Sequence, residues 1–462
     1  MFKRYIGDRA FYRHVLAIAV PIIIQNGISN FVSLLDNIMV GQVGTTQMSG
    51  VSIVNQLMLV FNLCIFGAAS GAGIFTAQFH GSQDHEGIRH TFRFKLLGCT
   101  LLTALGITLF LTAGRPLIRL YLQGEGDPAD AAATLAYGHA YLTVILFGLL
   151  PFAICNAYAS TLRECGQTVV PMVGGICAVF VNLGLNYVLI FGHFGFPAMG
   201  VAGAALATVI SRYVELAIVA CWTHLHSKEN PFIRGAYRAF RIPGELFRRI
   251  LVKAMPLLGN EFLWAAGVAF LNQCYSTCGL DVVPATNIAG TITNLSSVVI
   301  LSLGNTVGII MGQLLGAGRG EQEVRDANRK MIALGVVSGT VFGALLAAVS
   351  GVFPRFYNTT QAVRELSTWL ILISAVLMPF QAYLNAAYFT LRSGGKTGIT
   401  FLFDSGYMWM VSIPLAFILS RFTNIPILPL YILCQSMDII KCAVGFVMLR
   451  RGSWIQNLAA GK

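Results

Sequence analysis

The sequence predicts an all-α polytopic membrane protein with twelve transmembrane helices arranged as two six-helix bundles. Of its 462 residues, 56% are hydrophobic and only 11% are charged, and the mean hydropathy is +0.70. Soluble domains carry about 25% charged residues. The apolar runs are long enough to cross a hydrocarbon core about 30 Å thick, which needs about 20 helical residues. A transmembrane β-barrel would instead show short alternating segments.

The apolar runs divide the chain into twelve predicted spans. We expect them near residues 14–41, 50–78, 92–113, 132–160, 169–191, 201–223, 250–277, 283–314, 331–352, 366–390, 398–419 and 427–449. The polar, basic segment 1–14 lacks the cleavage site of a signal peptide. The first span is therefore expected to serve as the insertion signal.

The basic residues predict the orientation in the membrane. The net charge is +12, and most of the 31 Lys and Arg residues fall at the termini and in the even-numbered loops, among them Lys3, Arg4 and Lys462. Cytoplasmic segments of membrane proteins carry such an excess. We expect both termini on the cytoplasmic side of the plasma (inner) membrane. The charge then needs no nucleic-acid partner, and none is expected.

The second half of the chain repeats the pattern of the first. At an offset of 235 residues, several residues have identical counterparts, among them Pro21 and Pro256, Gly44 and Gly279, and Gly81 and Gly316. The segment 151–168 also resembles 379–397. Its matching residues include Asn156 and Asn385, Arg163 and Arg392, and Gly166 and Gly395. Internal repeats of this kind are common in secondary transporters.

The repeat predicts the domain organisation. We expect an N-terminal six-helix bundle over residues 1–225, a cytoplasmic linker over 226–249 and a C-terminal six-helix bundle over 250–462. Because six is an even number, both bundles start on the same side of the membrane. A pseudo-two-fold axis along the membrane normal would then relate them.

One acid, Asp36, lies within the first apolar span. An ionised carboxylate near the middle of a bilayer costs about 3 kcal/mol on insertion scales, so such an acid predicts a functional site. The alternative is an acid near a helix end that polar neighbours neutralise. Pro21, in the same span, lacks a backbone N–H and is a predicted hinge of the helix.

These features resemble the MATE family of multidrug and toxic compound extrusion antiporters, in particular its bacterial NorM-like and DinF-like members. The resemblance depends on Pro21 preceding Asp36, on the sequence DNIMVGQVG that closes the first span, and on a Gly-rich second span that ends in Gln-x-x-Gly. It covers essentially the whole chain. It implies a V-shaped pair of bundles and export of organic, often cationic compounds in exchange for protons or Na⁺.

The resemblance also implies a coupling site for a proton or Na⁺ in the N-terminal half. Its residues would be Asp36, Asn182, Asn186 and Thr208. Asn182 and Asn186 are four residues apart and share one helix face, so their amide oxygens are expected to converge on the ion. Oxygen ligands suit a hard cation. Some family members have Asp where Asn186 stands, so the choice between proton and Na⁺ stays open. The alternative role of the Asn pair is interhelical hydrogen bonding alone.

A second site, for substrate or another cation, is expected from five further polar residues: Asn156, Glu261, Gln381, Asn385 and Asp404. Leu271 stands where the repeat would place a second Asp36, and Glu261 resembles an acid of the NorM-type branch. That branch tends to carry an acid on the tenth span, where this chain has only Gln381 and Asn385. Glu261 is alternatively a carboxylate near the membrane surface.

Other charged residues within the spans are expected to be structural. Arg212 and Glu215 are three apart on one helix, as are Asp438 and Lys441. Each pair is therefore predicted to neutralise itself. Asp404 has no partner near in sequence and stays a candidate for the second site.

The sequence therefore predicts a monomeric antiporter of small organic molecules that works by alternating access and needs no cofactor besides its coupling ion. A flippase for a lipid-linked saccharide is the alternative, although such a protein is expected to have a basic cleft. An enzyme is not expected, because the HExxH, GxSxG and phosphate-loop patterns are absent from the sequence.

Overall fold

The computed structural model describes residues 5–122, 128–423 and 425–460, apart from the side chains of Leu34 and Asn37. Twelve of the described helices are long and apolar enough to cross a membrane. Each overlaps the predicted span of the same order, so the predicted all-α membrane fold is confirmed. Lys3, Arg4 and Lys462, which support the predicted orientation, lie outside the described residues.

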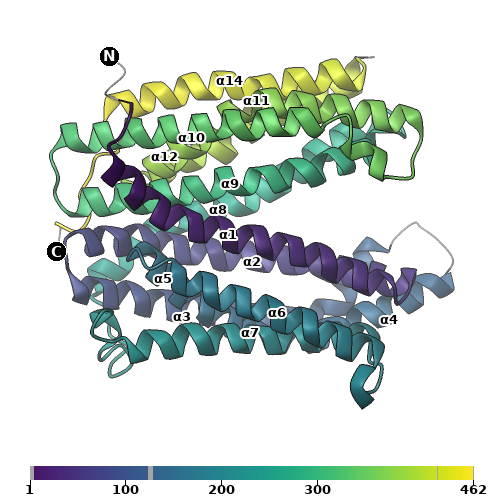
Figure 1. Ribbon diagram of the computed structural model, residues 1–462, viewed down its shortest axis with the longest axis horizontal. Helices are drawn as coiled ribbons and strands as arrows, with labels where there is room; N and C mark the ends of the chain where they lie inside the picture. Colours follow the sequence, from purple (N-terminus) through teal and green to yellow (C-terminus); the bar gives the residue numbers. More distant parts are fainter. Residues whose placement is uncertain (1–4, 123–127, 424, 461–462) are drawn as a thin grey trace. The chain divides into compact units, whose positions relative to one another are not determined.

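The helices of the first half have the following bounds (Figure 1): α1 Arg9–Gly41, α2 Thr45–Gly81, α3 His85–Tyr121, α4 Pro128–Ile145, α5 Leu149–Glu164, α6 Val169–Phe191 and α7 Gly200–Leu225. The helices of the second half are α8 Gly244–Ser276, α9 Val282–Gly316, α10 Glu321–Val349, α11 Gln361–Ser393, α12 Thr397–Phe401, α13 Ile413–Phe422 and α14 Ile427–Arg451. A 3₁₀ turn, η2 Leu146–Gly148, joins α4 to α5 in one span. Two π-helical segments, η6 Leu402–Gly406 and η7 Met408–Ser412, join α12 to α13.

The bounds of the helices reproduce the sequence repeat. Helices α1 and α8 each have 33 residues, and adding 235 to the bounds of α1 gives those of α8. The turns that follow them contain Gly44 and Gly279, whose φ angles are +155° and +147°. Side chains disfavour these angles, so both repeats require glycine there. The matched Gly166 and Gly395 also have positive φ, +81° and +73°.

The residues form two compact units, which do not coincide with the halves of the sequence. Unit 1 consists of Met1–Ile23, Ala77–Asp84 and Met255–Lys462, and unit 2 of Ile24–Thr76 and His85–Ala254. Helices α1, α2 and α8 each contribute residues to both units. The predicted domain limits at 225 and 250 stay a prediction.

Close helix packing at small residues organises unit 2. There α6 packs on α7, and α5 contacts both α3 and α7. At the crossing of α2 and α4, a β-carbon added at Gly50 would lie 2.8 Å from the backbone nitrogen of Gly138. Membrane helices approach one another closely where such small residues face each other.

In unit 1, α9, α10, α11 and α14 pack side by side (Figure 1). The end of α2 joins them through the two Gln-x-x-Gly elements of the repeat. A β-carbon at Gly81 would overlap the carbonyl oxygen of Gln313, and one at Gly316 would overlap that of Gln78. Each glycine therefore allows its helix to lie directly against the backbone of the other helix.

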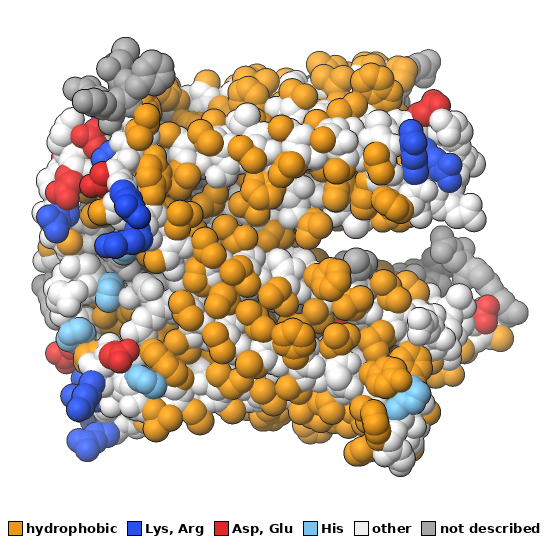
Figure 2. Space-filling view, viewed as in Figure 1, with side chains coloured by type: hydrophobic (Ala, Val, Ile, Leu, Met, Phe, Trp, Pro, Cys, Tyr) orange, Lys and Arg blue, Asp and Glu red, His pale blue; other side chains and the backbone are white. Residues whose placement is uncertain are grey.

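The outer surface of the helices suits a lipid environment. On the face shown in Figure 2, charged side chains gather near the ends of the helices, and hydrophobic side chains cover the flanks between them. Helix α3, for example, exposes Leu101, Leu105 and Leu109, which are four residues apart and share one face. Exposed apolar stripes of this length are expected where helices contact lipid.

Candidate functional site

The four residues predicted to form the coupling site lie together in unit 2. Asp36 comes from α1, Asn182 and Asn186 from α6, and Thr208 from α7. The Asn186 Nδ2 donates to Asp36 Oδ1 at 2.7 Å. With its amide nitrogen toward Asp36, Asn182 donates to both carboxylate oxygens at 3.0 and 3.1 Å, and its oxygen accepts from the Thr208 hydroxyl at 3.2 Å.

The packing of α6 on α7 brings these side chains together. Asn182 and Asn186 are one turn apart and both buried. Gly203 on α7 permits a close approach, because a β-carbon there would lie 2.6 Å from the carbonyl oxygen of Leu189 on α6. Thr208 follows on α7 at the level of Asn182.

The convergence of the two amide oxygens on a bound ion stays a prediction. The nitrogen of Asn186 points at Asp36, and that of Asn182 does so in the orientation that satisfies both ends of its amide. The reason is that a carboxylate accepts hydrogen bonds and draws the donor end of each amide. The oxygen Oδ1 of Asn186 is buried and has no hydrogen-bond partner among the described residues. The amide therefore retains an unused acceptor beside the carboxylate.

A cavity of about 380 Å³ adjoins this group of residues within unit 2. Asp36, Asn186 and Thr208 are part of its wall. Other lining residues include Ser33, Asn55, Met58, Asn62, Tyr141 and Phe152. Pockets for small organic ligands have volumes of about 300–1,000 Å³ and combine apolar walls with a few polar groups. The cavity therefore has the size and lining of a small-molecule site.

The predicted hinge, Pro21, lies in the interior of α1, which continues through it. The boundary between the two units crosses α1 at Ile23 and Ile24, directly after this proline. The repeat-related Pro256 lies in α8, which the same boundary crosses between Ala254 and Met255. Both repeats thus place a proline where a helix passes from one unit to the other.

The structure overturns the expected pairing of Asp438 with Lys441. The Lys441 Nζ on α14 lies 2.8 Å from Asp404 Oδ1, a partner distant in sequence, and interacts with Asp438 only electrostatically. Sequence spacing identifies neighbours on one helix only, and Asp404 and Lys441 lie on different elements. The expected pair of Arg212 and Glu215 is confirmed at 3.4 Å.

An asparagine that the sequence did not single out, Asn260, connects the residues around Asp404. Its Nδ2 donates to Asp404 Oδ2 at 3.1 Å and to the Tyr388 hydroxyl at 3.3 Å. Its Oδ1 accepts from the backbone N–H of Ser405 at 3.2 Å. The sequence did contain a signal for Asn260, because this polar residue directly precedes the predicted Glu261 in an apolar helix. Asp404 and Ser405 lie in a π-helical segment, and such segments are frequent at functional sites.

The remaining candidates for the second site are spread over several elements. Glu261, on α8, interacts electrostatically with Asp404 and Arg392. Gln381 and Asn385 lie one turn apart on α11, and Asn385 Oδ1 is buried without a hydrogen-bond partner among the described residues. Asn156 lies on α5 in unit 2. Its role stays a prediction, as does a second site in the C-terminal half.

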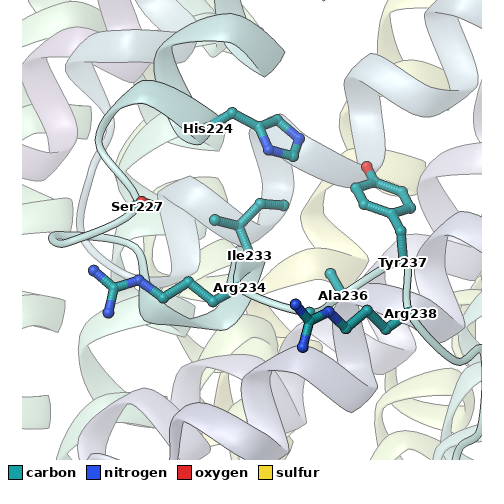
Figure 3. A pocket seen from close by; sticks show the side chains of 8 residues that line it. His224, Ser227, Ile233, Arg234, Ala236, Tyr237 and Arg238 are labelled. Atoms are coloured by element: carbon teal, nitrogen blue, oxygen red, sulfur yellow. The ribbon is translucent and has the colours of Figure 1, made fainter.

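A further pocket of about 450 Å³ lies at the segment between α7 and α8. Figure 3 shows the rings of His224 and Tyr237 on one side of it and the side chains of Arg234 and Arg238 on the other. The hydroxyl of Tyr158 on α5 contacts both His224, at 3.0 Å, and Tyr237. Burial raises the pKa of Tyr237, so its hydroxyl stays neutral near pH 7.

Arg93 on α3 fixes this segment in place. Its guanidinium donates to the carbonyl oxygens of Gly235 and Ala236, both at 2.8 Å, and of Arg241 at 3.1 Å. None of the residues predicted for the functional sites lines the pocket. The pocket is therefore separate from the predicted sites and lies in the segment that Arg93 anchors.

The comparison with known proteins establishes the family. The MatE family model matches residues 21–188 and 256–418, and each matched range begins at one of the two repeat-related prolines. The chain belongs to the MatE family. The resemblance seen in the sequence is thereby confirmed.

Individual relatives of this MatE chain are distant but match it over nearly their whole length. It is 23% identical over 463 residues to the probable multidrug resistance protein NorM of Thermotoga maritima, covering 98% of the chain and 96% of that protein. It is 25% identical over 439 residues to the probable multidrug resistance protein YoeA of Bacillus subtilis, covering 91% and 89%. A multidrug resistance MATE family transporter solved in an outward-facing conformation has a TM-score of 0.85 at 19% identity, covering 98% of each chain. That structure supports the fold.

Proposed function

We propose that the protein is a secondary active transporter that exports small organic compounds in exchange for protons or Na⁺, with Asp36 as the coupling group. The observation that carries this proposal is the contact of a membrane carboxylate with the Asn186 and Asn182 amides beside a ligand-sized cavity. Family membership and the names of the curated relatives support export of drugs.

The residues at Asp36 suit either coupling ion. Rotation of an asparagine amide by 180° exchanges its nitrogen and oxygen at nearly the same positions. Asn182, Asn186 and Thr208 then offer oxygen atoms beside the carboxylate, which is the donor set that a hard cation prefers. A proton would instead neutralise Asp36 directly. Either ion removes the negative charge that a cationic group of a substrate would contact, so ion and substrate compete.

Competition at one carboxylate is sufficient for exchange. The ion binds Asp36 from the outside and displaces the substrate there. After the ion is released on the inside, the empty carboxylate binds substrate again from that side. One charge that moves across 100 mV releases about 2.3 kcal/mol, which supports about a 45-fold concentration ratio of a neutral substrate. Export of a monovalent cation for one coupling ion needs a chemical ion gradient in addition, because no net charge moves.

We further propose a plasma (inner) membrane location with both termini in the cytoplasm and a monomeric state. The distribution of Lys and Arg supports this orientation. Of the residues that line the cavity in the described part of the chain, one carries a carboxylate and one a guanidinium. This lining does not favour the alternative of a flippase, for which a predominantly basic cleft is expected.

The test is transport of an organic dye in proteoliposomes with an imposed proton or Na⁺ gradient. The wild-type chain is expected to concentrate the dye with one of the two gradients, and Asp36→Asn is expected to abolish that accumulation. Asp130→Asn, at the exposed start of α4, is the matched control. Accumulation against a gradient by the Asp36→Asn protein would overturn the role of Asp36.

A further inference from the structure

The cavity beside Asp36 contains a second charged residue, Arg212 on α7. Arg212 follows Thr208 by four residues, so it lies one turn further along the same helix face. It interacts electrostatically with Asp36. The cavity thus combines a carboxylate with a guanidinium.

The Glu215 pair leaves most of the Arg212 guanidinium free to bind a ligand. Nη1 of Arg212 contacts Glu215 Oε2 at 3.4 Å, and the guanidinium lies 4.7 Å from the centre of the Phe152 ring. The side chain of Arg212 is 37% exposed, whereas that of Glu215 is 14% exposed. Nε and Nη2 of Arg212 have no hydrogen-bond partner among the described residues. A guanidinium has five N–H donors whose planar arrangement matches a carboxylate or phosphate.

The neighbours of Arg212 hold it in position. Glu215 lies one turn away on the same helix and is the more buried partner, so it fixes one end of the guanidinium. The ring of Phe152, another residue of the cavity wall, supports the flat face. The side chain is therefore oriented before a ligand binds, and less conformational entropy is lost on binding.

The two charges of the cavity select among three classes of substrate. A simple cation would contact Asp36 but leave the remaining donors of Arg212 without a ligand and its positive charge nearby, which is unfavourable at low dielectric. A simple anion would bind best after the coupling ion has neutralised Asp36, which produces binding together with the ion and not exchange. A molecule with both charges pairs with both residues, and the coupling ion displaces its cationic part.

We propose that the cavity binds an organic zwitterion, with its cationic group at Asp36 and its anionic group at Arg212, and that Arg212 determines this specificity. The inference rests on the proposed exchange at Asp36 and adds the substrate class.

The test uses two dyes that differ only in the charge of one group. Rhodamine 110 carries a free carboxylate and is a zwitterion, and rhodamine 123 is its methyl ester and a cation. Binding to the purified full chain is measured by fluorescence polarisation without an ion gradient. The wild-type chain is expected to bind the carboxylate dye at least about tenfold more tightly than the ester dye. Hydrogen bonds to charged groups contribute about this factor or more to affinity.

The variant Arg212→Met is expected to lose about tenfold to a hundredfold in affinity for the carboxylate dye and to bind the ester as well as before or better. Arg212→Lys should retain part of the preference because it keeps the charge. Arg119→Met, an exposed arginine on α3, is the matched control and should leave both affinities unchanged. Thermal unfolding of each variant verifies that it is folded.

Three results would overturn the assignment of Arg212. In the first, Arg212→Met lowers the affinity for both dyes equally. In the second, the wild-type chain binds the ester more tightly than the carboxylate dye, and in the third it does not bind the carboxylate dye. Failure of the proposed exchange is distinguishable, because it would leave the binding preference intact while an imposed gradient failed to drive dye accumulation.

Discussion

The Nζ of Lys441 on α14 forms an ion pair with Asp404 at 2.8 Å, within the π-helical part of the preceding span. The side chains are 12% and 23% exposed, and Asn260 donates a further hydrogen bond to the carboxylate. Both charges lie in a predicted transmembrane span, where an unpaired charge is costly. The pair therefore joins α14 to the segment between α12 and α13.

Removal of one member of this pair should destabilise the protein strongly. Lys441→Met leaves Asp404 unpaired, and breaking a buried pair costs about 3–5 kcal/mol. The double variant with Asp404→Leu should recover most of the loss, because the carboxylate that Lys441 pairs with is then removed as well. Thermal unfolding in detergent measures the effect.

The control for this prediction is the more exposed pair of Asp326 and Arg329 on α10, at 2.9 Å. Asp326→Asn should change stability by at most about 1 kcal/mol, as is usual for exposed pairs. If Lys441→Met cost no more than Asp326→Asn, the ion pair would not stabilise the helix packing.

The side chain of Gln78, at the end of α2, should hold the C-terminal segment. Its Oε1 accepts from the backbone N–H of Leu458 at 2.6 Å, and its Nε2 donates to the carbonyl oxygens of Ser393 at 2.9 Å and Gln456 at 3.2 Å. Gln78→Ala removes all three bonds and should cost about 1–3 kcal/mol, because buried groups lose their partners. Amide hydrogen exchange at Leu458 should become faster.

Gln361→Ala is the matched control, because Gln361 is exposed and, among the described residues, its side chain bonds only to that of Glu365, at 2.8 Å. It should leave exchange at Leu458 unchanged. Unaltered exchange in Gln78→Ala would mean that other contacts, such as the burial of Trp454, hold the segment.

The contact of the two Gln-x-x-Gly elements leads to a third prediction. A β-carbon at Gly316 would overlap the carbonyl oxygen of Gln78, so Gly316→Ala should force the helices apart and cost about 1–3 kcal/mol. Gly98, in α3, has no other atom within 4 Å of its β-carbon position. Gly98→Ala should therefore be neutral or slightly stabilising. Equal unfolding temperatures for the two variants would contradict the close approach.

The fold was predictable because its signals are local in the sequence. Apolar runs define the spans, and the repeat of Pro21, Gly44 and Gly81 defines the order of the elements. The meeting of Asp36 with Asn182 across two helices was implied by the family resemblance and not by spacing. Both asparagines contact Asp36 in the structure, as that implication requires.

The pairing of Asp404 with Lys441 was not predictable from spacing, since 37 residues separate them and only helix packing brings them together. The same is true of Gln78 and Leu458, which are 380 residues apart. The role proposed for Arg212 was missed for a different reason. Its predicted pair with Glu215 does form, but pairing on one helix does not reveal that Arg212 also lines the cavity.

Pro21 provides the last prediction, which concerns movement. It lies in α1 directly before the point where that helix passes from unit 1 to unit 2, and Asp36 lies further along the same helix in unit 2. A proline lowers the cost of bending because one backbone hydrogen bond is missing. If α1 bends there during transport, Pro21→Ala should slow ion-driven dye efflux and leave equilibrium binding of the dye unchanged.

The matched control for Pro21→Ala is Pro116→Ala, because Pro116 also lies inside a helix, α3, but away from any boundary between the units. Pro116→Ala should leave the efflux rate unchanged. Efflux and binding are measured on the same preparation, so that a loss of folded protein lowers both. A parallel fall of both quantities in Pro21→Ala would assign Pro21 a role in stability, and only a selective fall in the efflux rate supports a hinge.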